Sequence, residues 1–161
     1  MRLALVGITL VAAAACAAVV ASALAAPSGT AARMTTLTLV GKATSFTHVD
    51  NPPKNVFGQG DSVVYAGIQS SPQGGKRMGT GTGQCVQSSK TGPKPAILFC
   101  TSTISLARGQ LVLAGAVVDE ARRNVVAVIG GTGTYRGARG QAVENYIDDE
   151  SSRWTLSFET N

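Results

Sequence analysis

Residues 96–118 read AILFCTSTISLARGQLVLAGAVV, and they carry the clearest structural signal in the chain. Two apolar segments, about 96–107 and 110–118, flank the dipeptide Arg108-Gly109, which is a typical turn signal. Neither segment shows a helical period, and both are rich in residues that favour strands. These residues therefore predict two antiparallel strands joined by a tight turn.

Two cysteines predict how the preceding strand pairs with this one. If residues 76–87 form a hairpin with 96–107 around the loop 90–95, Cys85 lies directly opposite Cys100. A slip of one residue would invert the face and separate the cysteines. The face that carries the cysteines then alternates small and large residues: Gly81, Gly83, Ser102, Ile104, Leu106, Leu111, Leu113, Gly115 and Val117. Such a face predicts the inside of a barrel.

The rest of the chain repeats this pattern of short strands and turns. Gly and Pro turns separate eight segments, which we predict as strands at about 35–49, 61–69, 76–87, 96–107, 110–118, 124–129, 141–147 and 153–159. Charged residues make up only 14% of the chain and hydrophobic residues 44%, which argues against a charged helical bundle and against disorder. We predict an all-β fold, an eight-stranded antiparallel barrel with a sandwich as the alternative.

The N-terminus has the features of a secretory signal peptide. Arg2 precedes an uncharged run, residues 3–26, that is rich in Ala, Val and Leu, and Ala23-Leu24-Ala25 fits the small-x-small cleavage pattern. We therefore predict a signal peptide at 1–25, a flexible leader at 26–34, a barrel domain at 35–161, and a secreted, extracellular protein. A retained membrane anchor is the rival interpretation, since the run is long enough to span a bilayer. After cleavage we expect no membrane association.

Cysteine and charge counts agree with export. Cys16 leaves with the signal peptide, so Cys85 and Cys100 form an even pair, which in an exported chain predicts a disulfide. The formal net charge is +5, but the basic residues are dispersed and form no stripe with interleaved aromatics. We expect no nucleic-acid partner.

A glycine-rich segment, GGTGTYRGARG at 130–140, follows an apolar strand and imitates a dinucleotide-binding loop. Its spacing is a loose match, and the residues after it alternate like strands, whereas the fingerprint requires a helix. We interpret the segment as a tight structural connection and expect no cofactor. Its structural glycines are Gly130, Gly131, Gly133, Gly137 and Gly140.

The same segment resembles the G-G-T-G-x-[FY]-x-x-A-x-G segment of dirigent proteins and allene oxide cyclases. Gly60-Asp61, Arg77-Met78-Gly79, Gly83-Gln84-Cys85 and Gly109-Gln110-Leu111 resemble further family positions in the same order. The chain, over residues 37–158, is identified as an exported bacterial member of this family. The resemblance implies a calycin-type barrel of eight antiparallel strands with an apolar cavity, and enzymes that guide cyclisation or coupling without cofactors. It also implies a possible homo-oligomer.

The site expectations follow from pairing the segment 61–69 with 76–87. Tyr65 would then face Gly81, and Asp61 would approach Cys85, so both become candidate catalytic residues, with buried Asp61 as acid or base. The alternative is that Asp61 caps a turn and Tyr65 is ordinary core. Allene oxide cyclases carry a Glu on the first strand, and residues 35–49 contain no carboxylate. The expected lining of the cavity is Leu98, Ile104, Leu106, Leu113 and Val117.

Other chemistry has little support in the sequence. His48 is the only histidine, so we expect no metal site and no Ser-His-Asp triad. The acidic run 148–150 lacks the alternating spacing of a calcium loop and predicts a solvated turn. Two functions remain open: a cofactor-independent cyclase or isomerase acting on an apolar small molecule, or a non-catalytic secreted ligand-binding or scaffold domain.

Overall fold

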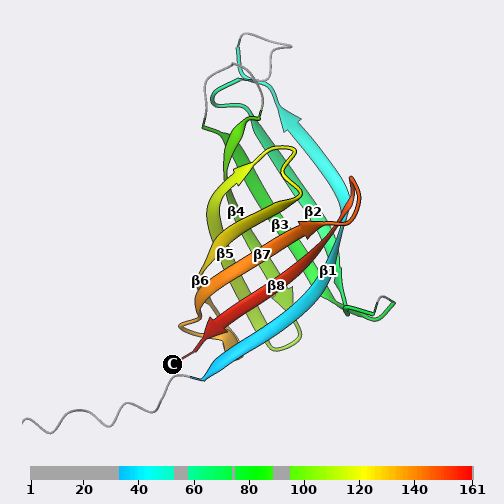
Figure 1. Ribbon diagram of the computed structural model, residues 1–161, viewed down its shortest axis with the longest axis vertical. Helices are drawn as coiled ribbons and strands as arrows, with labels where there is room; N and C mark the ends of the chain where they lie inside the picture. Colours follow the sequence, from blue (N-terminus) through cyan, green and yellow to red (C-terminus); the bar gives the residue numbers. More distant parts are fainter. Residues whose placement is uncertain (1–32, 53–57, 74, 89–94, 161) are drawn as a thin grey trace, which may run out of the picture. The chain divides into compact units, whose positions relative to one another are not determined.

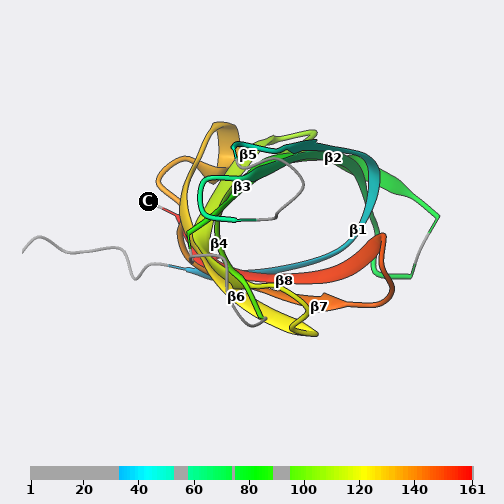
Figure 2. The ribbon, with the colours of Figure 1, turned by 90° about the horizontal axis from the view of Figure 1, so that it is seen from above.

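The protein folds as a closed barrel of eight antiparallel strands, as the sequence predicts. The computed structural model describes residues 33–52, 58–73, 75–88 and 95–160. Each strand pairs with the next along the chain, and the last pairs with the first, so the strands form a closed ring (Figures 1 and 2). The strands are β1 (Met34–Val49), β2 (Ser62–Ser70), β3 (Arg77–Gln87), β4 (Ile97–Leu106), β5 (Gly109–Val118), β6 (Arg123–Gly131), β7 (Arg139–Tyr146) and β8 (Ser151–Glu159).

The predicted strand ends agree with the structure to within two residues. The alternation of residue types and the Gly/Pro turns were sufficient to place them. The expected signal peptide at 1–25, most of the leader at 26–34, and the loop residues 53–57 and 89–94 lie outside the described residues. Within the described ranges, no helix has the length and apolarity needed to cross a bilayer.

The register of β3, β4 and β5 confirms the pairing predicted from the cysteines. Cys85 lies opposite Cys100 and the two form a disulfide. Gly83 lies opposite Ser102, and Leu98 of β4 lies opposite Val117 of β5. The odd positions of β3 and β5 and the even positions of β4 therefore point into the barrel, because side chains alternate between the two faces of a strand.

The predicted register of β2 against β3 is wrong by two residues. Tyr65 lies opposite Gly83 and not Gly81, and the backbone of Asp61 pairs with Gln87. A shift of two residues leaves every side chain on the same face, so the alternation of the sequence does not detect it. The pairing also contains an irregularity between Gln69 and Ser70, next to the hairpin loop.

One half of the barrel interior is filled by side chains. The largest fully buried side chains lie there and come from β1, β5, β6 and β8. They are Leu39, Leu111, Leu113, Val128, Leu156 and Phe158. The short 3-10 helix η1 (Gly133–Tyr135) packs against this half, where the rings of Tyr135 and Phe158 form a T-shaped pair with centroids 5.9 Å apart. We call this part of the barrel the filled half.

The glycine-rich connection closes the filled half. Gly133 has φ +59°, and a Cβ there would lie 2.3 Å from the carbonyl oxygen of Arg108. A side chain is excluded by both the backbone conformation and the close approach. The segment 130–140 is therefore a structural connection, as predicted, with its ends in β6 and β7.

Candidate functional site

The other half of the barrel contains a cavity of about 270 Å³. The strands that contribute Leu39, Ala142 and Leu156 to the filled half contribute Phe46, Tyr146 and other residues to the cavity. We call this part the hollow half. Ile104, Leu113 and Val126 belong both to the core cluster and to the cavity lining, so they form its floor.

Four of the five predicted lining residues border the cavity, namely Leu98, Ile104, Leu113 and Val117. The disulfide between Cys85 and Cys100 borders it as well. Leu106 instead packs against the core cluster in the filled half. It lies opposite Gly109 at the far end of β4, beyond the floor. The sequence predicts its face correctly but not its depth in the barrel.

Tyr65 lies in the cavity wall on β2, over a glycine on the neighbouring strand. Its ring carbon Cζ and its hydroxyl are both 2.5 Å from the position that a Cβ at Gly83 would occupy. The hydroxyl shares a hydrogen bond of 2.6 Å with Ser102 Oγ. Burial raises the pKa of Tyr65, although the Ser102 hydrogen bond acts in the opposite direction. Tyr65 is therefore a neutral phenol at ordinary pH, able to donate or accept a hydrogen bond.

Asp61 lies outside the cavity lining described here. Its side chain is 3% exposed and its two carboxylate oxygens accept backbone hydrogen bonds, from Asn51 N–H at 2.8 Å and Gly58 N–H at 2.7 Å. Both donors belong to the connection between β1 and β2. The contacts match the alternative in which this carboxylate caps a turn.

Glu144 on β7 is a carboxyl group within the cavity that sequence reasoning missed. Its residue is 9% exposed. Burial raises the pKa of Glu144, while hydrogen bonds from Ser152 and Tyr146 act in the opposite direction. Burial, followed by the charge of Glu144, also raises the pKa of the Tyr146 phenol. The cavity thus holds a carboxyl group that retains its proton more firmly than an ordinary glutamate.

The sequence did contain a signal for Glu144. On β7 the inward positions alternate as Ala142, Glu144 and Tyr146, and Ala142 is fully buried. Glu144 pairs with Trp154 on β8, the only tryptophan of the chain, which also lines the cavity. A glutamate in phase with a buried alanine is a candidate interior carboxyl, because side chains on one face recur every second residue.

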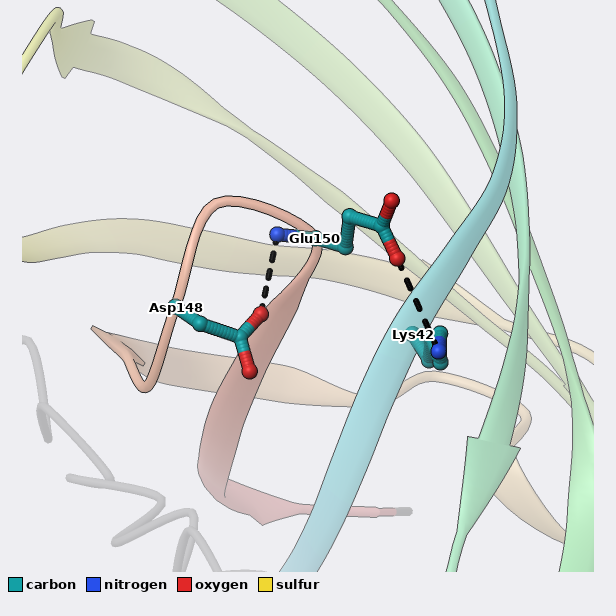
Figure 3. A network of polar contacts seen from close by, with 3 residues as sticks. All are labelled: Lys42, Asp148 and Glu150. Atoms are coloured by element: carbon teal, nitrogen blue, oxygen red, sulfur yellow. Dashed lines mark hydrogen bonds and ion pairs between the residues drawn. The ribbon is translucent and has the colours of Figure 1, made fainter.

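Charged residues of β1 and of the turn between β7 and β8 also border the cavity, among them Lys42 and Glu150. Lys42 Nζ on β1 lies 3.6 Å from Glu150 Oε2, and both side chains are 65% exposed (Figure 3). The N–H of Glu150 donates a hydrogen bond of 2.9 Å to Asp148 Oδ1, which lowers the pKa of that carboxyl. The run 148–150 forms a solvated turn, as predicted. Among the described residues, no three His, Cys, Asp or Glu side chains gather as a possible metal site.

The fold and the cavity together make this protein a small closed β-barrel that is filled in one half and hollow in the other. The chain belongs to the allene oxide cyclase barrel-like domain family, whose pattern matches residues 44–153. This match confirms the resemblance noted in the sequence. No curated protein sequence matches the chain at a significant level.

Several solved structures share the fold. A pyocyanin demethylase superposes with a TM-score of 0.69 at 22% identity, over 77% of this chain and 99% of its own. A pterocarpan synthase dirigent protein gives 0.67 at 18% identity, over 80% and 97%. The Diels-Alderase AbmU from Streptomyces koyangensis gives 0.61 at 17% identity, over 83% and 71%. At these identities the comparison establishes the barrel, and activity has to be argued from the site.

Proposed function

We propose that this protein takes an apolar small molecule into its cavity and catalyses a cyclisation or isomerisation there without a cofactor. The observation that carries the proposal is Glu144, a buried carboxyl group with a raised pKa among mainly apolar walls. Burying an ionisable group is unfavourable, and such groups concentrate at functional sites. Membership of the family, and the enzymes among the similar structures, support an enzymatic function.

The chemistry follows from what the side chains can exchange. The Glu144 carboxyl donates its proton to one position of the substrate, and the carboxylate formed removes a proton from another position. The enzyme ends with the proton count it began with, so an isomerisation needs no oxidant or reductant. The neutral Tyr65 phenol donates a hydrogen bond to an oxygen on which negative charge develops. The apolar walls hold the substrate in a folded conformation that brings its reacting atoms together.

A second function, ligand binding without turnover, also has an observation in its favour. Asp61, the carboxylate that the sequence nominated as acid or base, is engaged by two backbone N–H groups outside the cavity lining. The catalytic proposal therefore depends on Glu144 and not on Asp61. If Glu144 does not transfer protons, the same cavity serves as a ligand site alone.

We also propose that the protein acts after export. The charge and apolar pattern of residues 1–25 is typical of a signal peptide. The disulfide between Cys85 and Cys100 supports this location, since disulfides persist in oxidising compartments.

The experiment begins with protein purified from its producing organism. Native mass spectrometry identifies the small molecule carried by the barrel, and turnover and binding of that compound are then measured for wild type, Glu144→Gln and Glu159→Gln. Glu159 is an exposed carboxyl at the end of β8, away from the cavity lining. We expect Glu144→Gln to bind but not to convert the compound, and Glu159→Gln to behave as wild type. Conversion at an undiminished rate by Glu144→Gln would refute the catalytic role.

A further inference from the structure

Gln69 places a polar group near the cavity floor. It lies on β2, lines the cavity, and is only 6% exposed. Its amide occupies the space left by glycines on the two neighbouring strands. The Nε2 atom lies 2.7 Å from the Cβ position of Gly81 and 3.1 Å from that of Gly41. A side chain at either glycine would displace the amide, so this backbone is shaped around Gln69.

The amide of Gln69 is incompletely satisfied. Its Oε1 is buried and accepts no hydrogen bond from the described residues. A buried acceptor without a partner is unfavourable, and native proteins contain few of them. The Gln69 Oε1 atom can therefore accept a hydrogen bond from a ligand in the cavity.

We propose that the cavity floor is a polar subsite, in which Gln69 hydrogen-bonds a hydroxyl group at the leading end of an apolar ring compound. This inference deepens the proposed function, since it rests on the cavity being a ligand site. It assigns Gln69 a role in selecting which compounds enter and in which orientation they lie. Glu144 lines the same cavity, on the strand next to the one that carries Trp154.

A hydroxyl group fits this floor better than other polar groups. The indole nitrogen of Trp154 and Oε1 of Gln69 each lie 3.3 Å from the same point, the Cβ position of Gly41. The first is a donor and the second an acceptor. A hydroxyl group combines both roles, since it can donate to the Gln69 amide oxygen and keeps lone pairs that can accept from a neighbouring donor. A ketone or ether offers no donor, and an ammonium group would bring a charge into a largely apolar cavity.

The test uses two probes of nearly equal shape, 2-naphthol and 2-methylnaphthalene, which differ in a hydroxyl and a methyl group. Their dissociation constants are measured by isothermal titration calorimetry for wild type, Gln69→Met and Gln87→Met. Gln87 is the matched control, because it is also buried, at 3% exposed, but lies outside the cavity lining. Methionine preserves the length of the side chain and removes its hydrogen bonds.

We expect wild type and Gln87→Met to bind 2-naphthol roughly tenfold more tightly than 2-methylnaphthalene, as one buried hydrogen bond allows. In Gln69→Met this ratio falls to about one, while 2-methylnaphthalene still binds, which also shows that the variant is folded. Equal affinities in wild type, or an unchanged ratio in Gln69→Met, would overturn the subsite and leave the cavity proposal standing. Failure of wild type to bind either probe would overturn both.

Discussion

The two halves of this barrel are built from the same strands but serve different purposes. In the filled half, Leu39, Leu156 and Phe158 are at most 1% exposed. In the hollow half, the same strands present glycines, hydroxyls and a carboxyl group around a cavity of about 270 Å³. Stability is concentrated where packing is complete, because dispersion and burial are lost wherever a side chain faces empty space. The filled half supports the fold and so permits the hollow half to remain open.

The largest expected effect on the free energy of unfolding comes from comparing the same type of substitution, Leu to Ala, in each half separately. Leu156→Ala in the filled half leaves a closed void, and we expect it to lower the free energy of unfolding by about 3–5 kcal/mol. Leu98→Ala in the hollow half only enlarges an existing cavity, and we expect a loss of about 1–2 kcal/mol, near the transfer free energy alone. Urea denaturation monitored by circular dichroism measures both. Equal losses would show that the hollow half is packed in solution.

The disulfide is expected to have the next largest effect, because it joins two strands of the hollow half where packing is weakest. Cys85 and Cys100 are separated by 15 residues, for which chain entropy gives about 3 kcal/mol. We expect the double variant Cys85→Ser, Cys100→Ser to lose about that much stability, again by urea denaturation. Denatured, unreduced mature protein should show no reactive thiol. Two titratable thiols would contradict the bridge.

How far the sequence predicted this division can be judged from particular residues. The register of β3 against β4 was predictable because the two cysteines admit only one alignment on that face, and that of β4 against β5 because the Arg108-Gly109 turn is tight. The β2 register was missed by two residues, since a shift of two preserves every face. Leu106 and Leu98 look alike in the sequence, and only their depth along β4 places Leu106 against the core cluster and Leu98 at the cavity.

The candidate site was less predictable than the fold. Glu144 lies on β7, which has polar residues at both of its ends. That Glu144 points into the barrel can therefore be inferred only from its position two residues after the buried Ala142. Asp61 is buried, but the partners of its carboxylate are backbone N–H groups of the irregular connection between β1 and β2, which the alternation of residue types does not describe. The unfilled volume itself has no sequence signature, because leucines and valines line both halves.

A substitution at Gly83 tests whether the cavity and its stability require small residues in the hollow half, as the core requires large residues in the filled half. A Cβ at Gly83 would lie 2.5 Å from the Tyr65 ring and 2.8 Å from the Thr101 carbonyl oxygen. We expect Gly83→Ala to displace Tyr65, to weaken 2-naphthol binding severalfold, and to lower stability by about 1–3 kcal/mol. Gly130→Ala is the control, because its Cβ would meet only the end of Arg139 at 3.7 Å. Equal behaviour of both variants would contradict the close packing of Tyr65 on Gly83.

The smallest expected effect is a pH dependence that belongs to Glu144 alone. Burial raises the pKa of Glu144 above its ordinary value of 4.5, so the folded protein holds this proton more firmly than the unfolded chain. Below the ordinary value both states are protonated, and the stabilisation by this proton is fully present. Between the ordinary and the raised pKa, the unfolded chain has released the proton and the folded protein still holds it. The stabilisation therefore decreases as the pH rises over this interval, and it is lost above the raised pKa.

Glu144→Gln removes that titration and keeps the shape of the side chain. We therefore expect the stability of wild type relative to Glu144→Gln to fall with rising pH from the ordinary carboxyl range upward, and to level off above the raised pKa. Urea midpoints of both proteins at a series of pH values give this difference. The contribution of Asp148, whose pKa is lowered by its backbone hydrogen bond, has the opposite sign and cancels because both proteins carry it. A difference that rises with pH would mean that the folded protein favours the carboxylate, and Glu144 would then act as a fixed charge and not as a proton donor.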